Sequence, residues 1–171
     1  MSIEPPLASS DPARLRRAWT GLIIEVFRLN GDLLAAGDTL VGDLGLTSAR
    51  WQVLGAIALS PVPLPVAHIA RNMGLTRQAV QRVVDDMRVD GVVGLEPNPH
   101  HRRAMLVVMT DAGDAAYRAA CERQERWADA LANGLPAESF EAASGLLREM
   151  QRRLDESRAP TSPSRRESEG A

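Results

Sequence analysis

The first helix predicted from the pattern of apolar and polar positions lies near the start of the chain. Its apolar residues are separated by alternating steps of four and three, which place them on one helix face. They are Leu15, Trp19, Leu22, Val26, Leu29 and Leu33. Ser10 or Asp11 can cap this helix, and Pro12 suits its first turn. Gly37 is the first of three glycines expected to end it.

Two further helices are predicted after position 110. Thr110 can cap a long helix that runs to about Asn133 and stops at Gly134. Pro136 opens a last helix, whose apolar residues repeat at steps of three and four on a charged background, a pattern typical of packing against another helix. We therefore expect the first and last helices to form the interface of a homodimer. The residues expected there are Leu15, Trp19, Leu22, Val26, Phe140, Leu147, Met150 and Leu154.

The middle of the chain has the pattern of a helix-turn-helix. Residues 66–73 (VAHIARNM) predict a short helix, and Gly74 is its stop. Thr76 can cap a second helix that ends at Gly91. Two helices joined by a tight turn with glycine form this motif.

Short strands are predicted around these helices. The aliphatic segments 92–97 and 104–110 flank a polar tip and predict a hairpin. Thr47 or Ser48 starts a helix that ends before the proline-rich segment 61–65, which is expected to be a connector with one short edge strand. The expected fold class is mainly α with a small β-hairpin wing (α+β), a winged helix-turn-helix flanked by dimerisation helices.

The second helix of the motif carries side chains suited to reading DNA. Its first turns present Arg77, Gln78, Gln81 and Arg82. Arginine can pair with guanine and glutamine with adenine in the major groove. On an isolated helix these residues would more simply be a solvated face. The preceding helix and the following hairpin, with Arg102 and Arg103 at its tip, favour DNA binding instead.

Charge is distributed unevenly along the 171 residues. The net charge is −2, but residues 63–110 hold six arginines against four acidic residues. The basic share therefore lies around the predicted DNA-reading helix. No apolar run is long enough to cross a bilayer, and the N-terminus lacks the pattern of a signal peptide, so we expect a cytoplasmic protein.

The expected domain organisation follows from these elements. Residues 1–9 and 158–171 are rich in proline, serine and charge, and we expect them to be disordered tails. Residues 10–60 and 111–157 form the helical dimerisation region. Residues 61–110 form the winged helix-turn-helix DNA-binding domain.

Three segments, 45–57, 66–93 and 98–113, resemble the MarR family of bacterial transcriptional regulators. The resemblance covers roughly residues 10–157. It implies an obligate homodimer that binds pseudo-palindromic operators and usually represses nearby genes. It also implies release of DNA when a small, often aromatic or anionic, effector binds between the dimerisation and DNA-binding parts. The DNA-binding positions that it implies are Thr76, Arg77, Gln78, Gln81, Arg82, Arg102 and Arg103.

The wing departs from the family pattern at one position. An aspartate commonly precedes the arginine pair there and ion-pairs with an arginine, whereas this chain has His101, preceded by His100. A protonated histidine cannot form that pair. Either the wing is more mobile in this protein, or Arg82 and Arg103 have other partners.

Other candidate residues have competing interpretations. Trp19 and Trp51 could line an effector pocket between the first two helices, or they could pack in the core. The single cysteine, Cys121, is expected to be a buried, inert thiol, with redox sensing as the alternative. Trp127 is expected at the helical dimer interface.

The sequence favours a regulator over an enzyme. It has neither a glycine-rich phosphate loop nor a Ser/His/Asp arrangement at a strand end, and no cofactor is expected. The histidines and Cys121 lack the spacing of metal ligands. Three hypotheses remain: a ligand-responsive DNA-binding regulator, a DNA-binding regulator without a small-molecule ligand, and a winged-helix protein-interaction module.

Overall fold

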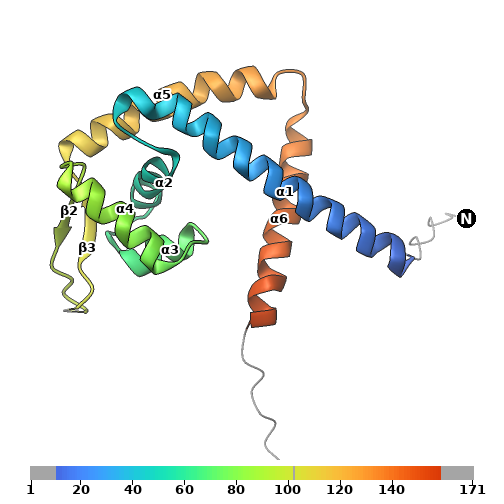
Figure 1. Cartoon of the computed structure of the whole chain (residues 1–171), viewed down its shortest axis with the longest axis horizontal. Coiled ribbons are helices and arrows are strands. Elements are labelled where there is room, and N and C mark those ends of the chain that lie inside the picture. Colours follow the sequence, from blue (N-terminus) through green and yellow to red (C-terminus); the bar gives the residue numbers. More distant parts are fainter. Residues whose placement is uncertain (1–10, 102, 159–171) are drawn as a thin grey trace, which may run out of the picture. The chain divides into compact units, whose positions relative to one another are not determined.

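The structure is a computed structural model that describes residues 11–101 and 103–158 (Figure 1). Over these residues the chain is mainly helical, with a small antiparallel sheet, which confirms the predicted fold class. Of the predicted tails, 1–9 and 158–171, only Arg158 lies within the described residues, and it is the last residue of a helix.

The start of helix α1 (Pro12–Val41) was predicted correctly, but its end was not. Its start agrees with the predicted cap, because the Asp11 carboxylate accepts hydrogen bonds from the backbone N–H groups of Ala13 (3.0 Å) and Arg14 (3.3 Å). The prediction that Gly37 ends the helix was wrong. A Cβ at position 37 would collide with the hydroxyl of Ser48, so the glycine lets two helices approach closely inside a continuous helix.

Ser48 is the buried polar residue at this approach. Its hydroxyl donates to the Leu34 carbonyl (2.6 Å), and its backbone N–H donates to Oδ1 of Asp38 (2.6 Å). It begins helix α2 (Ser48–Ala58), which Thr47 caps as predicted, and a short 3₁₀ turn, η1 (Gly42–Leu44), joins α1 to the α2 cap. These bonds tie α2 firmly to the end of α1.

The helix-turn-helix follows the predicted boundaries. Helix α3 (Val66–Asn72) leads through Gly74, which has a positive φ of 65°, to helix α4 (Arg77–Val89). Thr76 caps α4 by accepting from the N–H of Ala79 (3.2 Å). Glycine suits the left-handed conformation of this turn because it has no Cβ.

The sheet contains β1 (Leu64–Pro65), β2 (Val93–Glu96) and β3 (Leu106–Met109), in the order β1-β3-β2. The hairpin strands are shorter than predicted at both ends. The expected edge strand in segment 61–65 is present and pairs antiparallel with β3, with Leu64 opposite Val107. The wing is therefore anchored to the connector that precedes α3.

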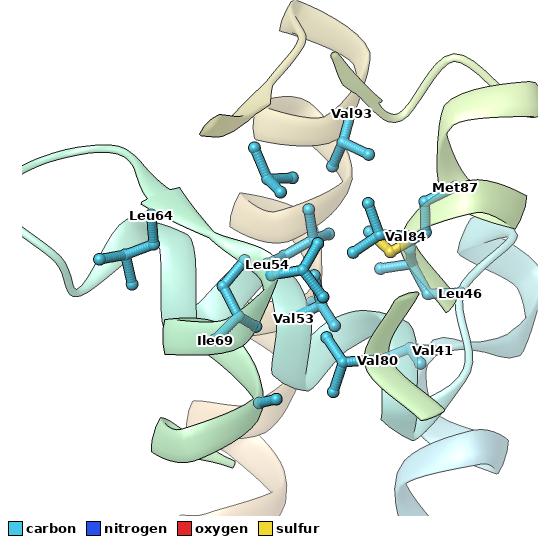
Figure 2. Packing of buried hydrophobic residues seen from close by; sticks show 14 residues of the cluster. Val41, Leu46, Val53, Leu54, Leu64, Ile69, Val80, Val84, Met87 and Val93 are labelled. Atoms are coloured by element: carbon cyan, nitrogen blue, oxygen red, sulfur yellow. The ribbon is translucent and has the colours of Figure 1, made fainter. Parts of the chain in front are cut away.

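The core lies between α2, α3, α4 and the sheet (Figure 2). Side chains from these elements point toward one another, among them Leu54, Ile69, Val80, Val84 and Met87. These side chains and that of Val107 are fully buried. Because Val80, Val84 and Met87 are the inward face of α4, burial fixes which face of this helix points outward.

Helices α5 (Asp111–Ala132) and α6 (Ala137–Arg158) complete the described chain. The N–H of Gly113 donates to the Thr110 hydroxyl (3.1 Å), which is the predicted cap of α5. The chain divides into two compact units, one ending at Trp127 and the other beginning at Ala128. Within the described residues, no helix combines the length and apolar character needed to span a bilayer.

Candidate nucleic-acid interface

The outward face of α4 carries the side chains predicted to contact DNA. Arg77, Gln78 and Arg82 are exposed, and Thr76 at the cap is exposed as well. Gln81 is half-buried, and its Nε2 donates a hydrogen bond to Oδ1 of Asp85 (3.1 Å). Sequence reasoning missed this pair, although the spacing of four residues on a helix could have indicated it.

The tip of the wing is shaped by Asn98. Its side-chain Oδ1 accepts from the N–H of His100 (3.0 Å), and its carbonyl accepts from the N–H of His101 (3.3 Å). The N–H of Ala104 then donates to the His101 carbonyl (2.9 Å), which turns the chain back toward β3. His101 and Arg103 are exposed, while Arg102 lies outside the described residues.

A hollow of about 1140 Å³ lies between the wing, the start of α3 and one flank of α4. Its aliphatic lining residues include Leu64, Leu95 and Leu106. Its ionisable lining residues are two arginines and all three histidines of the chain: Arg77, Arg103, His68, His100 and His101. Among the residues that the structure describes, no acidic residue lines it. The hollow is therefore suited to a polyanion. His68 was not predicted to belong to this surface, because its proximity to the wing depends on β1 pairing with β3.

The four predicted residues of α4 fall into two pairs. Arg77 and Gln81 line the hollow, whereas Gln78 and Arg82 are not among its lining residues. One pair thus faces the wing and the other lies elsewhere on the outward surface. Both pairs are separated by one helical turn, so each forms a row along the helix.

The arginines of this surface are not held by carboxylates. Among the described residues, no salt bridge involves Arg77, Arg82 or Arg103. The guanidinium groups are available to phosphate oxygens or base edges.

An ion pair holds the far end of α4. Arg50 of α2 contacts Asp90 at the C-terminus of α4 (Nη2 to Oδ2, 2.7 Å) and also donates to the Gly45 carbonyl (3.2 Å). A cation at this end also offsets the partial negative charge of the helix terminus. Sequence reasoning missed this pair, because Arg50 and Asp90 are forty residues apart and belong to no local pattern.

A second ion pair joins α5 to the 3₁₀ turn η1. Arg123 donates to the carboxylate of Asp43 (Nη2 to Oδ2, 2.9 Å) and to the Leu40 carbonyl (3.0 Å). The guanidinium lowers the pKa of the Asp43 carboxyl below its ordinary value. The turn η1 is therefore fixed from the α5 side.

The residues predicted for dimerisation are largely exposed in the single chain. Leu15 is 60% exposed, Leu154 47% and Leu147 40%, and Phe140 and Trp19 are exposed too. Leu22 and Val26 are half-buried, and Met150 is only 8% exposed. Other apolar residues of α1 are also exposed, among them Phe27 at 72%. They were not predicted for the interface because they lie outside the single apolar stripe that begins at Leu15.

The remaining candidates have ordinary positions. Trp51 is half-buried and packs against the core, and Trp19 is exposed; neither lines the hollow by the wing. Cys121 is half-buried, so the prediction of a buried thiol was wrong in degree. Trp127 is half-buried. Burial, with Cys121 as a smaller cause, raises the pKa of Tyr117 one turn earlier on α5.

A helix-turn-helix, an outward helix face bearing arginine and glutamine, and a basic wing beside it define a winged-helix DNA-binding protein. The comparisons with known proteins agree. A family model of the MarR family matches residues 44–104, from η1 through the wing tip.

Two curated relatives extend the match. An uncharacterized protein of Mycobacterium tuberculosis is 36% identical over 129 residues, which cover 75% of this chain and 89% of the relative. The transcriptional activatory protein BadR of Rhodopseudomonas palustris is 32% identical over 94 residues, or 54% of each protein. The chain belongs to the MarR family of transcriptional regulators, which are DNA-binding regulatory proteins and not enzymes.

Solved structures share the fold. A MarR/EmrR family regulator from Acinetobacter superposes with a TM-score of 0.72 at 16% identity, over 80% of this chain and 96% of that one. MOSR of Mycobacterium tuberculosis, solved with DNA, gives 0.64 at 22% identity over 77% and 96%. PcaV of Streptomyces coelicolor, solved with its natural ligand, gives 0.63 at 22% identity over 88% and 97%.

Proposed function

We propose that this regulator is a ligand-responsive repressor that acts as a homodimer on a pseudo-palindromic operator. The observation that carries the proposal is the surface formed by α4 and the wing. Within the described part of the chain, its Arg77, Arg82 and Arg103 form no salt bridge, and no acidic residue lines the hollow beside them. DNA phosphates are the polyanion that such a surface fits best.

In this proposal α4 enters the major groove and the wing reaches the adjacent minor groove or backbone. The contacts come from Thr76 and the wing arginines 102 and 103, and from the two rows of α4 described above. Two copies place their α4 helices in successive major grooves, so the half-sites lie about one helical turn apart, roughly 10 base pairs centre to centre. Residues 61–110 are the DNA-binding domain in this arrangement.

The homodimer is proposed because the exposed apolar residues of α1 and α6 need a cover. Leu15, Phe140, Leu147 and Leu154 are each at least 40% exposed in the single chain. Apolar rows at helical spacing on charged helices are typical of helix–helix interfaces. Residues 10–60 and 111–157 are therefore assigned to assembly, together with Trp127.

The effector is proposed to be a small aromatic or anionic compound that binds next to Trp19 and Trp51. PcaV, which shares the fold, was solved with its natural ligand. The test is quenching of tryptophan fluorescence by aromatic carboxylates, with release of bound DNA at the same concentrations. A regulator without a ligand would keep its DNA under every compound of this class.

DNA binding is tested by fluorescence anisotropy on the intergenic DNA upstream of the gene, at several salt concentrations. We expect tight, steeply salt-dependent binding that exceeds the affinity for unrelated DNA. Replacing Arg77 and Arg82 by alanine should abolish it, whereas the control Arg118→Ala, on α5, should not. The absence of any salt-dependent affinity for DNA would indicate a protein-interaction module instead.

The direction of regulation has a second candidate. BadR, a relative over 94 residues, is a transcriptional activatory protein. A reporter gene under the upstream promoter separates the two directions. Repression predicts higher expression when the regulator is deleted, and activation predicts lower expression.

A further inference from the structure

We propose that Asp85 is a specificity-determining residue that acts through Gln81, by fixing which way the Gln81 amide points before DNA is bound. This inference rests on the proposed function of α4 as the recognition helix. Asp85 is assigned no base contact of its own; its role is to position a base-reading residue.

The contact between the two side chains has only one chemically sensible orientation. Nε2 of Gln81 lies 3.1 Å from Oδ1 of Asp85, one helical turn further along α4. Carboxylate oxygens only accept hydrogen bonds, so the amide nitrogen must face Asp85. With the amide reversed, Oε1 would meet the carboxylate, and two acceptors would repel each other. Both residues are half-buried, which weakens competition from water.

The fixed amide leaves a defined pair of groups for a base. Gln81 has two N–H bonds, and Asp85 accepts from one of them. The second N–H and the carbonyl Oε1 remain free. Adenine presents an acceptor, N7, beside a donor, the N6 amino group, in the major groove. The free donor and acceptor of Gln81 match this pair, so Asp85 prepares the residue for adenine and avoids the cost of ordering it on binding.

A simpler role for Asp85 predicts different behaviour. A pair of residues four apart on a helix also gives a small stabilisation, and any aspartate near DNA repels phosphates. Both effects are independent of base sequence. Fixing the amide affects one base pair in each half-site and no other. Overall affinity and base preference therefore separate the two roles.

Asp86 provides a matched control. It is the next residue on α4, it is exposed, and among the described residues no side-chain hydrogen bond or salt bridge involves it. Asp85→Asn and Asp86→Asn remove the same charge with almost no change of shape. An asparagine at 85 can donate as well as accept, so it tolerates both orientations of the Gln81 amide.

The experiment measures the affinity of the full-length protein and its variants for the operator and for a panel of single-base changes in each half-site. Gln81→Ala first identifies the base pair that Gln81 reads, as the position where preference disappears. One bidentate contact gives a preference of roughly tenfold to a hundredfold there. Both asparagine variants should bind all sequences more tightly. Only Asp85→Asn should lower the preference at that position, by roughly threefold to tenfold.

The outcomes are distinguishable. If Gln81→Ala weakens binding equally across the panel, Gln81 does not read a base, and the proposed role fails together with the inference. If Gln81→Ala removes one preference but Asp85→Asn behaves like Asp86→Asn, Gln81 reads DNA and the role of Asp85 is wrong. The side-chain amide resonances of Gln81 in the free protein give a second measurement. They should shift in Asp85→Asn and not in Asp86→Asn; equal spectra would overturn the inference even if a variant bound DNA poorly.

Discussion

Arg103 of the wing is exposed and lines the hollow beside α4. His100 and His101 are exposed and line the same hollow. Asn98 fixes the backbone of the tip through hydrogen bonds to both histidines. The hydrogen bonds to Asn98 therefore hold the backbone of the wing tip, next to the cationic side chain of Arg103, in a defined turn.

Arg103→Ala should weaken binding to all operator variants by the same factor. A phosphate contact releases about one counterion, so the slope of log affinity against log salt should fall by about 1. The slope is measured by anisotropy across a salt series, with Arg118→Ala as control. A change confined to one base pair would instead indicate that Arg103 reads a base edge.

Glu149 on α6 gives the clearest prediction of pH dependence. Hydrogen bonds from Arg152 and Arg153 lower the pKa of its carboxyl from 4.5 to about 2. Because the folded pKa is depressed, the stabilising contribution is complete above pH 4.5 and is lost as the pH falls toward 2. The free energy of unfolding of the wild type should therefore exceed that of Glu149→Gln at neutral pH, with a gap that shrinks below pH 4.5. Denaturant titrations at several pH values test this; a gap that stays constant would exclude these ion pairs.

Among the secondary-structure elements, the contacts between helices α1 and α2 decide how the helix-turn-helix is attached to α1. Gly37 and Ser48 bring these helices together, and Arg123 fixes the turn η1 that connects them. Arg50 then links α2 to the end of α4. The recognition helix is held at its buried face by the core and at its C-terminus by an ion pair.

Replacing Gly31 and Gly37 of helix α1 by alanine should change the free energy of unfolding in opposite directions. Nothing lies within 4 Å of a Cβ built on Gly31, so Gly31→Ala should stabilise the protein by roughly 0.5–1 kcal/mol through helix propensity. At Gly37 the new methyl would collide with the Ser48 hydroxyl, so Gly37→Ala should destabilise by about 1–3 kcal/mol. Chemical denaturation measures both. Equal effects would mean that α1 and α2 pack less closely than the structure shows.

At the scale of the whole molecule, the exposed apolar residues of α1 and α6 are the feature that a single chain leaves unexplained. They do not belong to the core around α4, and exposing them to water is unfavourable. A second copy of the chain is the cover that we propose for them.

The pair of substitutions Leu147→Glu and Leu154→Glu should convert the proposed dimer into monomers. Both side chains are at least 40% exposed in the single chain, so the charges should disturb association without unfolding α6. Met150 is a poorer choice because it is already buried. Light scattering gives the mass, and Leu59→Glu, at a position 84% exposed on the end of α2, is the control. A stable dimer of the double variant would refute the assignment.

The features that depend on neighbours along the chain could be predicted from the order of residues. Helical caps such as Asp11, Thr47 and Thr76 satisfy N–H groups two or three residues away, so residue type and spacing are enough to find them. The same holds for the turn at Gly74 and for the periodic stripes of the long helices. The arginines and glutamines of α4 could be placed on its outward face for this reason.

Which of these elements meet depends on packing between distant parts of the chain. Glycine is a poor helix former, so a helix end was expected at Gly37, but α1 continues through it and the missing side chain leaves room for Ser48. The pairing of β1 with β3 brings His68 next to the wing, and the packing of α2 on α4 brings Arg50 to Asp90. The order of residue types along the chain does not encode these approaches locally. They arise because burying one face of each helix and strand in a common core leaves only one arrangement of the rest.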